Sequence, residues 1–477
     1  MEESKTFLNG LLWSFIDKII FVLFQIIIEI ILARILSPKE YGIMGIIIVI
    51  IALGMLFSES GFTNALINKK DRNDLDYNTS FYSNVGISVL IYILLFFTSP
   101  SIAQYFNEPI LEIIIRFLSL NIVFGALSLI PKVIISVNLD FKIQTRISII
   151  SLFLSSFISI YLAYKGFGVW ALVTQSFALN FFSLLLYYKY VKWRPKLEYS
   201  IASFTYLFNF SSKILVAGIL QNLYMYSYNF FIGKGISTQS LGIFSKSNQF
   251  TQMPVSLLST TLQRVFYPFV SNFQDNDIKI FNVSINFTQL IIAFFFPFMV
   301  IIATVSEPFV MLFLGEKWSE MIPILKIFSF AFMFYPIIVN NMMLFQIKNK
   351  PKTFLYIEII TKILGIVILL ATLNKGLLII CLGILLSIYL QLIITSVFSC
   401  KLLNFEIWSQ LKYILLYFAF AVIVYFCGDY LLRFFNNLWY KFIVGVAFVL
   451  LMYTSCYWFF IEKIRTIVSD FRGIVVV

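Results

Sequence analysis

The chain has 477 residues, of which 60% are hydrophobic and 12% are charged, and this balance excludes a soluble globular protein. Its net charge of +12 comes from cations scattered among short polar connections, which favours anionic phospholipids over nucleic acid as partners. The sequence contains no histidine and no P-loop motif, which excludes histidine-based catalysis, histidine metal sites and P-loop nucleotide hydrolysis. We therefore expect a membrane protein that is not an enzyme and that holds no metal or cofactor.

Long hydrophobic runs recur along the sequence, and each is close to the roughly 20 residues that an α-helix needs to cross a bilayer. They lack the alternation of an outer-membrane β-barrel, so we expect an all-α polytopic membrane protein with about 14 transmembrane helices. The runs lie at 12–33, 42–58, 79–98, 112–136, 145–164, 168–188, 205–232, 242–266, 280–305, 323–346, 353–372, 376–399, 410–428 and 441–461.

The connection between the first two runs, residues 33–42, carries a helix-start signal. Ser37 stands where an N-cap belongs, Pro38 takes the first helical position, and Glu40 can reach back to the free backbone N–H of the cap. The sequence therefore predicts a tight turn with a capping box, and a second helix that begins at Pro38. Arg34 lies in the last turn of the preceding helix, where a cation favours the negative end of the helix dipole.

The same pattern returns about 200 residues later, which indicates two repeats in the same order. Matching pairs are Ser37 and Ser237, Gly42 and Gly242, Arg116 and Lys326, and Lys142 and Lys352. We expect an N-terminal six-helix lobe over 1–199, a second six-helix lobe over 200–402, and two additional transmembrane helices with a cytoplasmic tail over 403–477.

Cations in the short connections set the expected orientation. The even-numbered connections are rich in Lys and Arg, whereas the connection over 99–111 has neither. We therefore expect both termini in the cytoplasm and the turn over 33–42 on the opposite side of the membrane. The cations of the even connections are Lys69, Lys70, Arg72, Lys142, Arg146, Lys189, Lys192, Arg194, Lys196, Lys348, Lys350 and Lys352.

With these enzyme classes excluded, a transporter is the class that remains. Ionisable groups in a membrane helix usually face the bundle interior or a water-filled cavity. One face of the first helix carries Ser14, Lys18, Val22, Gln25 and Glu29. That face fits either a cavity wall or packing between helices. Asp17 and Glu29 are candidates for ion coupling, as is Glu358 in the eleventh helix, whose spacing from Lys362 also predicts an intrahelical ion pair.

The seventh and eighth helices carry long polar faces. The seventh has Lys213, Ala217, Gln221, Tyr224 and Tyr228 on one line, and the eighth has Ser245, Gln249, Gln252, Ser256, Ser259 and Gln263, followed by Arg264. Amides, hydroxyls and aromatic rings together suit a carbohydrate, so we expect an aqueous or sugar-lined groove. Packing between helices is the alternative, and Lys213 can instead extend to the cytoplasmic headgroups.

Several short motifs resemble those of bacterial polysaccharide-export flippases, the Wzx-type members of the multidrug/oligosaccharidyl-lipid/polysaccharide superfamily. The motifs lie at 33–42, 166–172, 192–195, 263–268 and 314–318. The resemblance implies an inner-membrane protein that flips undecaprenyl-pyrophosphate-linked oligosaccharide from the cytoplasmic to the outer leaflet for O-antigen, capsule or exopolysaccharide synthesis. It also implies a polysaccharide polymerase and glycosyltransferases as partners. Tyr228 and Asn229 stand where the family often has an acidic residue, which argues against ion coupling there.

Arg116 and Lys326 occupy equivalent positions in the two repeats, about 6 Å inside the extracytoplasmic ends of their helices. The positive-inside rule gives no reason for a cation there, whereas a bound pyrophosphate does. We expect the two side chains to face one another across a cleft; the alternative is that both extend to the outer headgroups. The candidate substrate-binding residues are Arg34, Arg116, Lys213, Gln221, Tyr224, Gln249, Gln252, Arg264 and Lys326.

Two other functions stay open from the sequence. One is a small-molecule or multidrug antiporter of the same superfamily, although such proteins normally lack helices thirteen and fourteen and a cationic cleft disfavours cationic drugs. The other is a scaffold for a glycan-assembly complex that transports nothing, in which case substitutions of the polar groups in the cleft would be harmless.

Overall fold

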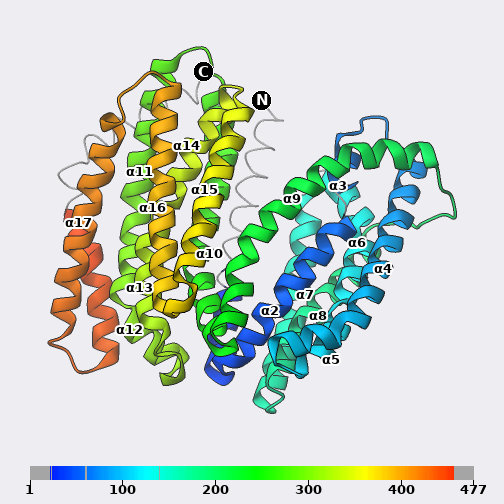
Figure 1. Ribbon diagram of the computed structural model, residues 1–477, viewed down its shortest axis with the longest axis horizontal. Coiled ribbons are helices and arrows are strands. Elements are labelled where there is room, and N and C mark those ends of the chain that lie inside the picture. Colours follow the sequence, from blue (N-terminus) through cyan, green and yellow to red (C-terminus); the bar gives the residue numbers. More distant parts are fainter. Residues whose placement is uncertain (1–21, 23, 60–61, 139, 456–477) are drawn as a thin grey trace. The chain divides into compact units, whose positions relative to one another are not determined.

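The computed structural model describes residues 22, 24–59, 62–138 and 140–455, and it has no β-strand among them. Helices make up the described part of the chain (Figure 1). They divide into two compact units, Met1–Ser245 and Lys246–Val477. The predicted all-α class is therefore confirmed, while the lobe boundaries at 199/200 and 402/403 stay predictions.

Unit 1 begins, in its described part, with a helix over 24–35. In this unit α7 and α8 pack as a pair, α4 packs on α5 and α6, and α2 packs on α9. The elements that follow the first helix are α2 (Pro38–Glu59), α3 (Phe62–Asn68), α4 (Asp74–Phe106), α5 (Ile110–Leu118), α6 (Leu120–Val137), α7 (Phe141–Tyr164), α8 (Val169–Tyr190), α9 (Ile201–Gly235) and the start of α10 (Thr238–Ser271).

Unit 2 holds the rest of α10 and the helices after it. Here α15 and α16 pack as a pair, α13 and α14 pack on α16, and α11 packs on α13 and α17. The elements are α11 (Asp277–Thr304), α12 (Ser306–Phe309), a π-helical turn η1 (Val310–Leu314), a 3-10 turn η2 (Glu316–Trp318), α13 (Met321–Phe332), α14 (Tyr335–Ile347), α15 (Pro351–Thr372), η3 (Leu373–Lys375), α16 (Leu377–Leu402), α17 (Trp408–Leu432) and a last helix over Leu438–Ser455.

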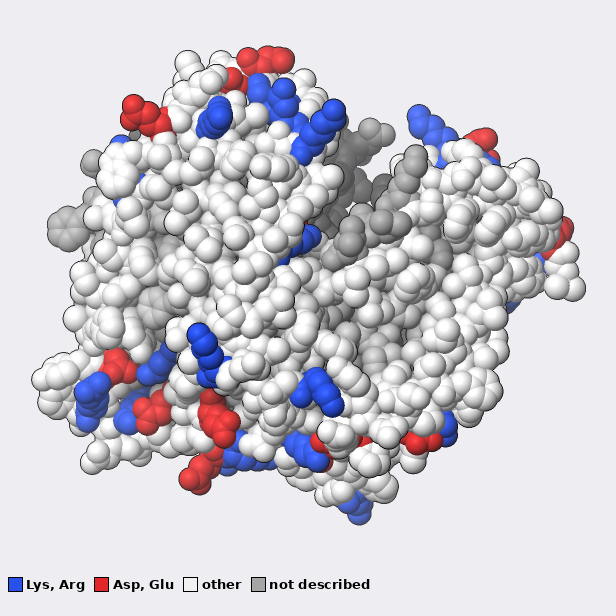
Figure 2. Space-filling view, in the orientation of Figure 1, with Lys and Arg blue, Asp and Glu red and all other residues white. Residues whose placement is uncertain are grey.

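Eleven helices of the described residues are long and apolar enough to cross a membrane, so the chain is a multi-pass membrane protein. Two further helices, α9 with 35 residues and α10 with 34, have the length to do so. On the face that Figure 2 shows, most charged side chains of each unit lie toward the helix ends, with a broad uncharged surface between them. Each predicted run coincides with a helix where it is described; the exact total of fourteen stays a prediction.

The two repeats share an interruption that the hydrophobic pattern did not reveal. The fourth span breaks into α5 and α6 at Ser119, and its counterpart, the tenth span, breaks into α13 and α14 at 333–334. The next helices, α7 and α15, begin at the equivalent residues Phe141 and Pro351. These shared breaks favour the predicted pair of six-helix repeats, which stays a prediction.

Within unit 1 the short connections gather at two opposite ends. At one end, the backbone N–H of Lys196, after α8, donates to the Asn78 side chain near the start of α4 at 3.1 Å. At the other, Lys39 at the start of α2 pairs with Glu108, between α4 and α5, at 3.0 Å. Connections of even and odd number thus lie at separate ends of this unit.

Unit 2 follows the same rule. Lys348, after α14, pairs with Asp277 at the start of α11 at 2.7 Å, which joins two even connections. Lys441, at the start of the last helix, pairs with Glu307 of α12 at 3.3 Å, at the opposite end of α11. In both units, therefore, even-numbered and odd-numbered connections lie at opposite ends, as the sequence predicts.

Which of these ends faces the cytoplasm is tested by reporter fusions. The excess of cations in even connections predicts a cytoplasmic signal after Lys70, Arg194 and Lys350. Fusions after Asn107, Lys234 and Lys317 are expected to report the opposite side. An alkaline phosphatase fusion at Asn107 that stays inactive, while the matching green fluorescent protein fusion is bright, would reverse the orientation.

Candidate functional site

The predicted capping box at the first turn is present. The Glu40 carboxylate accepts hydrogen bonds from the backbone N–H of Ser37 and, at 2.9 Å, from its hydroxyl. As predicted, α2 begins at Pro38. In the second repeat the Ser237 hydroxyl oxygen accepts from the backbone N–H of Ser240 at 3.0 Å, and α10 begins one residue after it. The two matching serines thus stand at helix starts that are capped differently: Glu40 caps the first turn, and the Ser237 hydroxyl caps the second.

These two turns meet at a reciprocal glycine contact, defined by Gly42, Gly242 and the carbonyl groups of Pro38 and Thr238, all in unit 1. A Cβ atom at Gly42 would lie 1.7 Å from the carbonyl oxygen of Thr238, and one at Gly242 would lie 1.8 Å from that of Pro38. No side chain can fit at either position without backbone movement. The sequence matched the two glycines to each other but gave no sign that they touch.

A second loop of unit 1 packs against the same turn. Gly166 and Gly168 have positive φ values of 80° and 56°, and a Cβ at Gly168 would lie 2.4 Å from the Glu40 carboxylate. Only glycine lets the backbone pass so close to this capping residue. A cavity of about 300 Å³ lies beside the turn. Its lining residues are Ser37, Lys39, Glu40, Ile43, Ile110, Gly166, Phe167, Gly168, Val169 and Trp170.

Of the predicted cations of unit 1, Arg34 is exposed at the end of the helix over 24–35, and Arg116 is held on α5. The Arg116 guanidinium pairs with Glu112 at 2.9 Å, donates to the Ser99 hydroxyl at 3.0 Å and lies 4.6 Å from the Phe96 ring centre. Its side chain keeps 33% of its surface exposed. Arg116 is therefore oriented by α4 and α5, with part of its guanidinium still open to a ligand.

Its counterpart in unit 2, Lys326 on α13, is bound to a helix beyond the repeats. Its ammonium lies 3.2 Å from the Asp429 carboxylate on α17, which also pairs with Arg433 at 3.2 Å. The Lys326 side chain is 30% exposed. Asp429 was missed by the sequence analysis, because it lies 103 residues away and in a separate hydrophobic run. Whether Arg116 and Lys326 face one another stays a prediction.

The polar faces of α9 and α10 contain one cation that the sequence analysis did not single out. Lys246 is only 2% exposed and donates to the side-chain oxygen of Gln249 at 2.8 Å. A lysine inside a hydrophobic run is itself a functional signal, so it could have been found. On α9, Gln221 is exposed, and Tyr224 is in edge contact with Tyr228 at 6.4 Å.

The structure describes only some of the remaining candidate side chains on these two faces. Gln252 is half-buried on α10. Lys213 and Arg264 lie in α9 and α10, but their side chains fall outside the described part, as does the whole of Asp17. Their proposed roles stay predictions.

Whether the α10 face is wet is tested by thiol labelling. Single cysteines at Gln249, Gln252 and Ser256 are expected to react with a water-soluble maleimide, because a long amide and hydroxyl stripe favours water. Cysteines at Leu257 and Leu258, on the same helix, are the matched controls and are expected to resist. Equal labelling at all five positions would contradict the prediction of an aqueous groove along α10.

The ion-coupling candidates differ in their surroundings. Glu29 is half-buried in the helix over 24–35. Glu358 on α15 pairs with Lys362 at 2.8 Å, so the predicted intrahelical ion pair is confirmed. This contact neutralises the Glu358 carboxylate locally, and ion coupling by Glu29 or Glu358 stays a prediction.

Unit 2 also contains a fully buried polar cluster that no motif indicated. Asn340 donates to the Ser284 hydroxyl at 3.0 Å, and Asn341 accepts from Gln410 at 2.8 Å. These contacts join α14 to α11 and to α17. A membrane interior offers these amides no water to bind, so their hydrogen bonds must be made within the protein. These bonds tie the three helices to one another.

Comparison with known proteins identifies the family. Residues 31–323, more than half of the chain, match the family described as "Polysaccharide biosynthesis protein". The chain belongs to this family. The matched region runs from the first capped turn to the start of α13, so it includes the glycine contact and Arg116.

Relatives within the polysaccharide biosynthesis family align over about two thirds of the chain. The teichuronic acid biosynthesis protein TuaB of Bacillus subtilis is 24% identical over 332 residues, covering 68% of each protein. The succinoglycan biosynthesis transport protein ExoT of Rhizobium meliloti is 22% identical over 329 residues, 69% of this chain and 67% of ExoT. The lipopolysaccharide biosynthesis protein WzxC of Escherichia coli is 25% identical over 333 residues, 67% of this chain and 65% of WzxC.

Solved structures establish the fold of this family member. The lipid II flippase MurJ in an inward closed conformation matches with a TM-score of 0.76 and 17% identity, over 96% of this chain and all of MurJ. An inward-facing multidrug MATE transporter matches with a TM-score of 0.57 and 12% identity, over 82% of this chain and 98% of the transporter. The fold is therefore that of the MurJ and MATE transporters.

Proposed function

We propose that the chain is a flippase that moves a lipid-linked oligosaccharide across the membrane for polysaccharide biosynthesis. Membership of the polysaccharide biosynthesis family over 31–323 carries this proposal. The names of TuaB, ExoT and WzxC support it, because each refers to the synthesis or transport of a surface or secreted glycan. The MurJ-like fold supplies a helical framework that suits such a transporter.

In this proposal the substrate is an undecaprenyl-pyrophosphate-linked repeat unit that travels from the cytoplasmic to the outer leaflet of the inner membrane. The partly exposed cations Arg116 and Lys326 contact the pyrophosphate, whose two phosphates favour charge-assisted hydrogen bonds. Amide and tyrosine side chains of α9 and α10 contact the sugars. A polymerase and glycosyltransferases act after and before this step.

The glycine contact acts as a closure in the same scheme. It holds the first turns of α2 and α10 together by close backbone packing. Release of the oligosaccharide at that end then requires the two turns to separate. With both termini in the cytoplasm, as the proposal has them, this closure would lie on the outer side.

The function is tested by deleting the gene in its host. Loss of surface polysaccharide, together with accumulation of a lipid-linked oligosaccharide in the membrane fraction, is the expected result, and the wild-type gene restores both. Normal polysaccharide with increased sensitivity to cationic dyes would instead favour the multidrug antiporter. A glycan defect rescued by a variant that lacks both Arg116 and Lys326 would favour the scaffold.

A further inference from the structure

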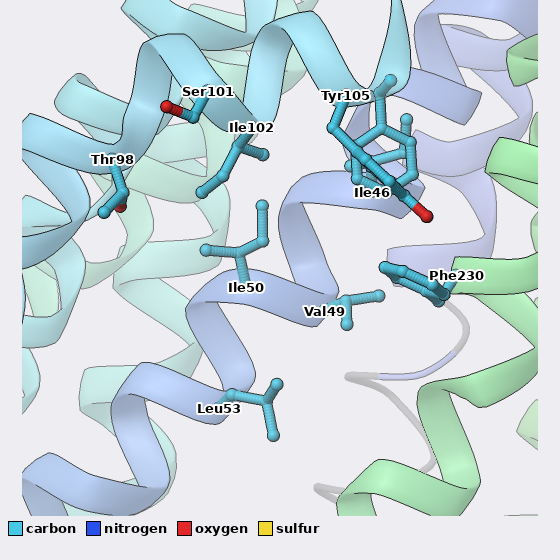
Figure 3. Close-up of a pocket in the computed structure, with 10 residues that line it drawn as sticks. Ile46, Val49, Ile50, Leu53, Thr98, Ser101, Ile102, Tyr105 and Phe230 are labelled. Carbon is cyan, nitrogen blue, oxygen red and sulfur yellow. The ribbon is translucent and has the colours of Figure 1, made fainter.

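Unit 1 contains an apolar pocket of about 340 Å³ that the proposed transport path does not use. It lies among α2, α4 and α9, and Figure 3 shows its side chains converging on one space. The lining residues are Ile46, Val49, Ile50, Leu53, Thr98, Ser101, Ile102, Tyr105, Phe106 and Phe230. The Thr98 hydroxyl donates to the Leu94 carbonyl at 2.8 Å, so it is satisfied within its own helix.

The shape of the pocket suits a hydrocarbon chain. Along α4 it extends from Tyr105, next to the end of that helix, inward to Thr98, which is about 10 Å at the usual helical rise. Its volume accommodates on the order of ten groups the size of a water molecule or a methylene. Water would find few partners there, and an apolar cavity of this size binds apolar molecules.

A cation stands at the end of the pocket nearer the membrane surface. Lys234 donates a hydrogen bond to the backbone oxygen of Tyr105, and its ammonium lies 4.5 Å from the centre of the Tyr105 ring. Tyr105 also stacks on Phe230 at 5.9 Å, so one aromatic pair forms both the pocket wall and the support of the cation. The Lys234 side chain is exposed and can reach a phosphate.

We propose that this pocket holds one acyl chain of an anionic phospholipid, with the lipid phosphate at Lys234. The apolar lining selects the chain, and the cation at its mouth selects an anionic headgroup over a zwitterionic one. The pocket takes only part of any long chain, whether acyl or polyprenyl. The assignment to a membrane lipid rests on the lining, none of whose residues is assigned to the proposed transport path, and competition with undecaprenyl phosphate separates the two occupants.

The test is native mass spectrometry of the purified full-length protein with added phosphatidylglycerol or with phosphatidylcholine of the same chains. The wild type is expected to retain one phosphatidylglycerol with at least tenfold preference over phosphatidylcholine. Ile50→Trp fills the pocket and is expected to reduce phosphatidylglycerol retention tenfold or more. Lys234→Gln is expected to abolish the preference. Ile93→Trp, on α4 outside the pocket and 44% exposed, is the matched control and is expected to bind like the wild type.

Each possible result decides the proposal. If Ile50→Trp does not yield folded protein, Val49→Phe takes its place with the same expected loss. Wild-type retention by the pocket-filling variant would overturn the proposal, as would equal loss in Ile93→Trp. So would displacement of phosphatidylglycerol by an equal amount of undecaprenyl phosphate, which would give the pocket to the substrate. Because binding is measured without transport, this outcome is independent of the proposed flippase function.

Discussion

Gly42→Ala is expected to destabilise the protein by about 1–3 kcal/mol, the usual cost of overpacking a tight site. The added methyl group would lie 1.7 Å from the Thr238 carbonyl oxygen. A backbone oxygen cannot turn aside as a side chain can, so one of the two helix starts must shift. Gly242→Ala meets the Pro38 carbonyl in the same way and is expected to have an equal effect. Thermal unfolding of the detergent-purified protein, followed by its fluorescence, measures the change.

Gly86→Ala on α4 is the matched control, since a Cβ there would meet nothing within 4 Å. It is expected to unfold at or slightly above the wild-type temperature, because alanine favours a helix over glycine. Glycan export in cells should follow the same order, with Gly42→Ala and Gly242→Ala impaired at equal membrane abundance. Wild-type stability and export in both Gly42→Ala and Gly242→Ala would show that the two turns do not meet as described.

The largest effect on transport is expected from the paired cations. Arg116→Gln and Lys326→Gln should each lower the rate of glycan export roughly tenfold or more, because each would lose the proposed charge-assisted contact with phosphate, which would contribute about 1.5–3 kcal/mol. The double variant is expected to abolish export. Arg116→Lys keeps the charge and should be milder. Export is measured as surface polysaccharide relative to protein in the membrane.

Their ion-pair partners separate a phosphate role from a structural one. Asp429→Asn and Glu112→Gln remove the pairs with Lys326 and Arg116 but keep both cations. If the cations contact phosphate, these variants should retain more than half of wild-type export. If the Lys326–Asp429 pair only joins α13 to α17, Asp429→Asn should be as defective as Lys326→Gln, and that result would assign Lys326 to packing.

Features that depend on near neighbours were predictable from the sequence. The capping box needs only residues 37–40, and the Glu358–Lys362 pair needs only one helical turn. The spans follow from composition alone, and helices coincide with each predicted run where the structure describes it. A segment's own sequence is enough to predict a membrane helix, because all of its backbone hydrogen bonds are made within that segment.

Contacts between distant residues were not predictable from one sequence. The glycine contact joins positions in different repeats, and the Lys326–Asp429 pair spans 103 residues. The break at Ser119 also escaped detection, because the apolar run continues through it. Lys246 is a different case: its contact with Gln249 lies within one helical turn, and a lysine inside a hydrophobic run could have indicated it, but the sequence analysis did not single it out.

Reconstitution tests the flippase function most directly. Purified protein is placed in liposomes that contain a lipid-linked oligosaccharide on both faces, and a glycosidase is added outside, where it reaches only the outer half in protein-free liposomes. A flippase is expected to carry the protected inner half to the outside, so that nearly all of the sugar becomes cleavable, and the Arg116→Gln, Lys326→Gln double variant should fail to do so. If about half stays protected with the wild type, as in protein-free liposomes, the proposed function is contradicted.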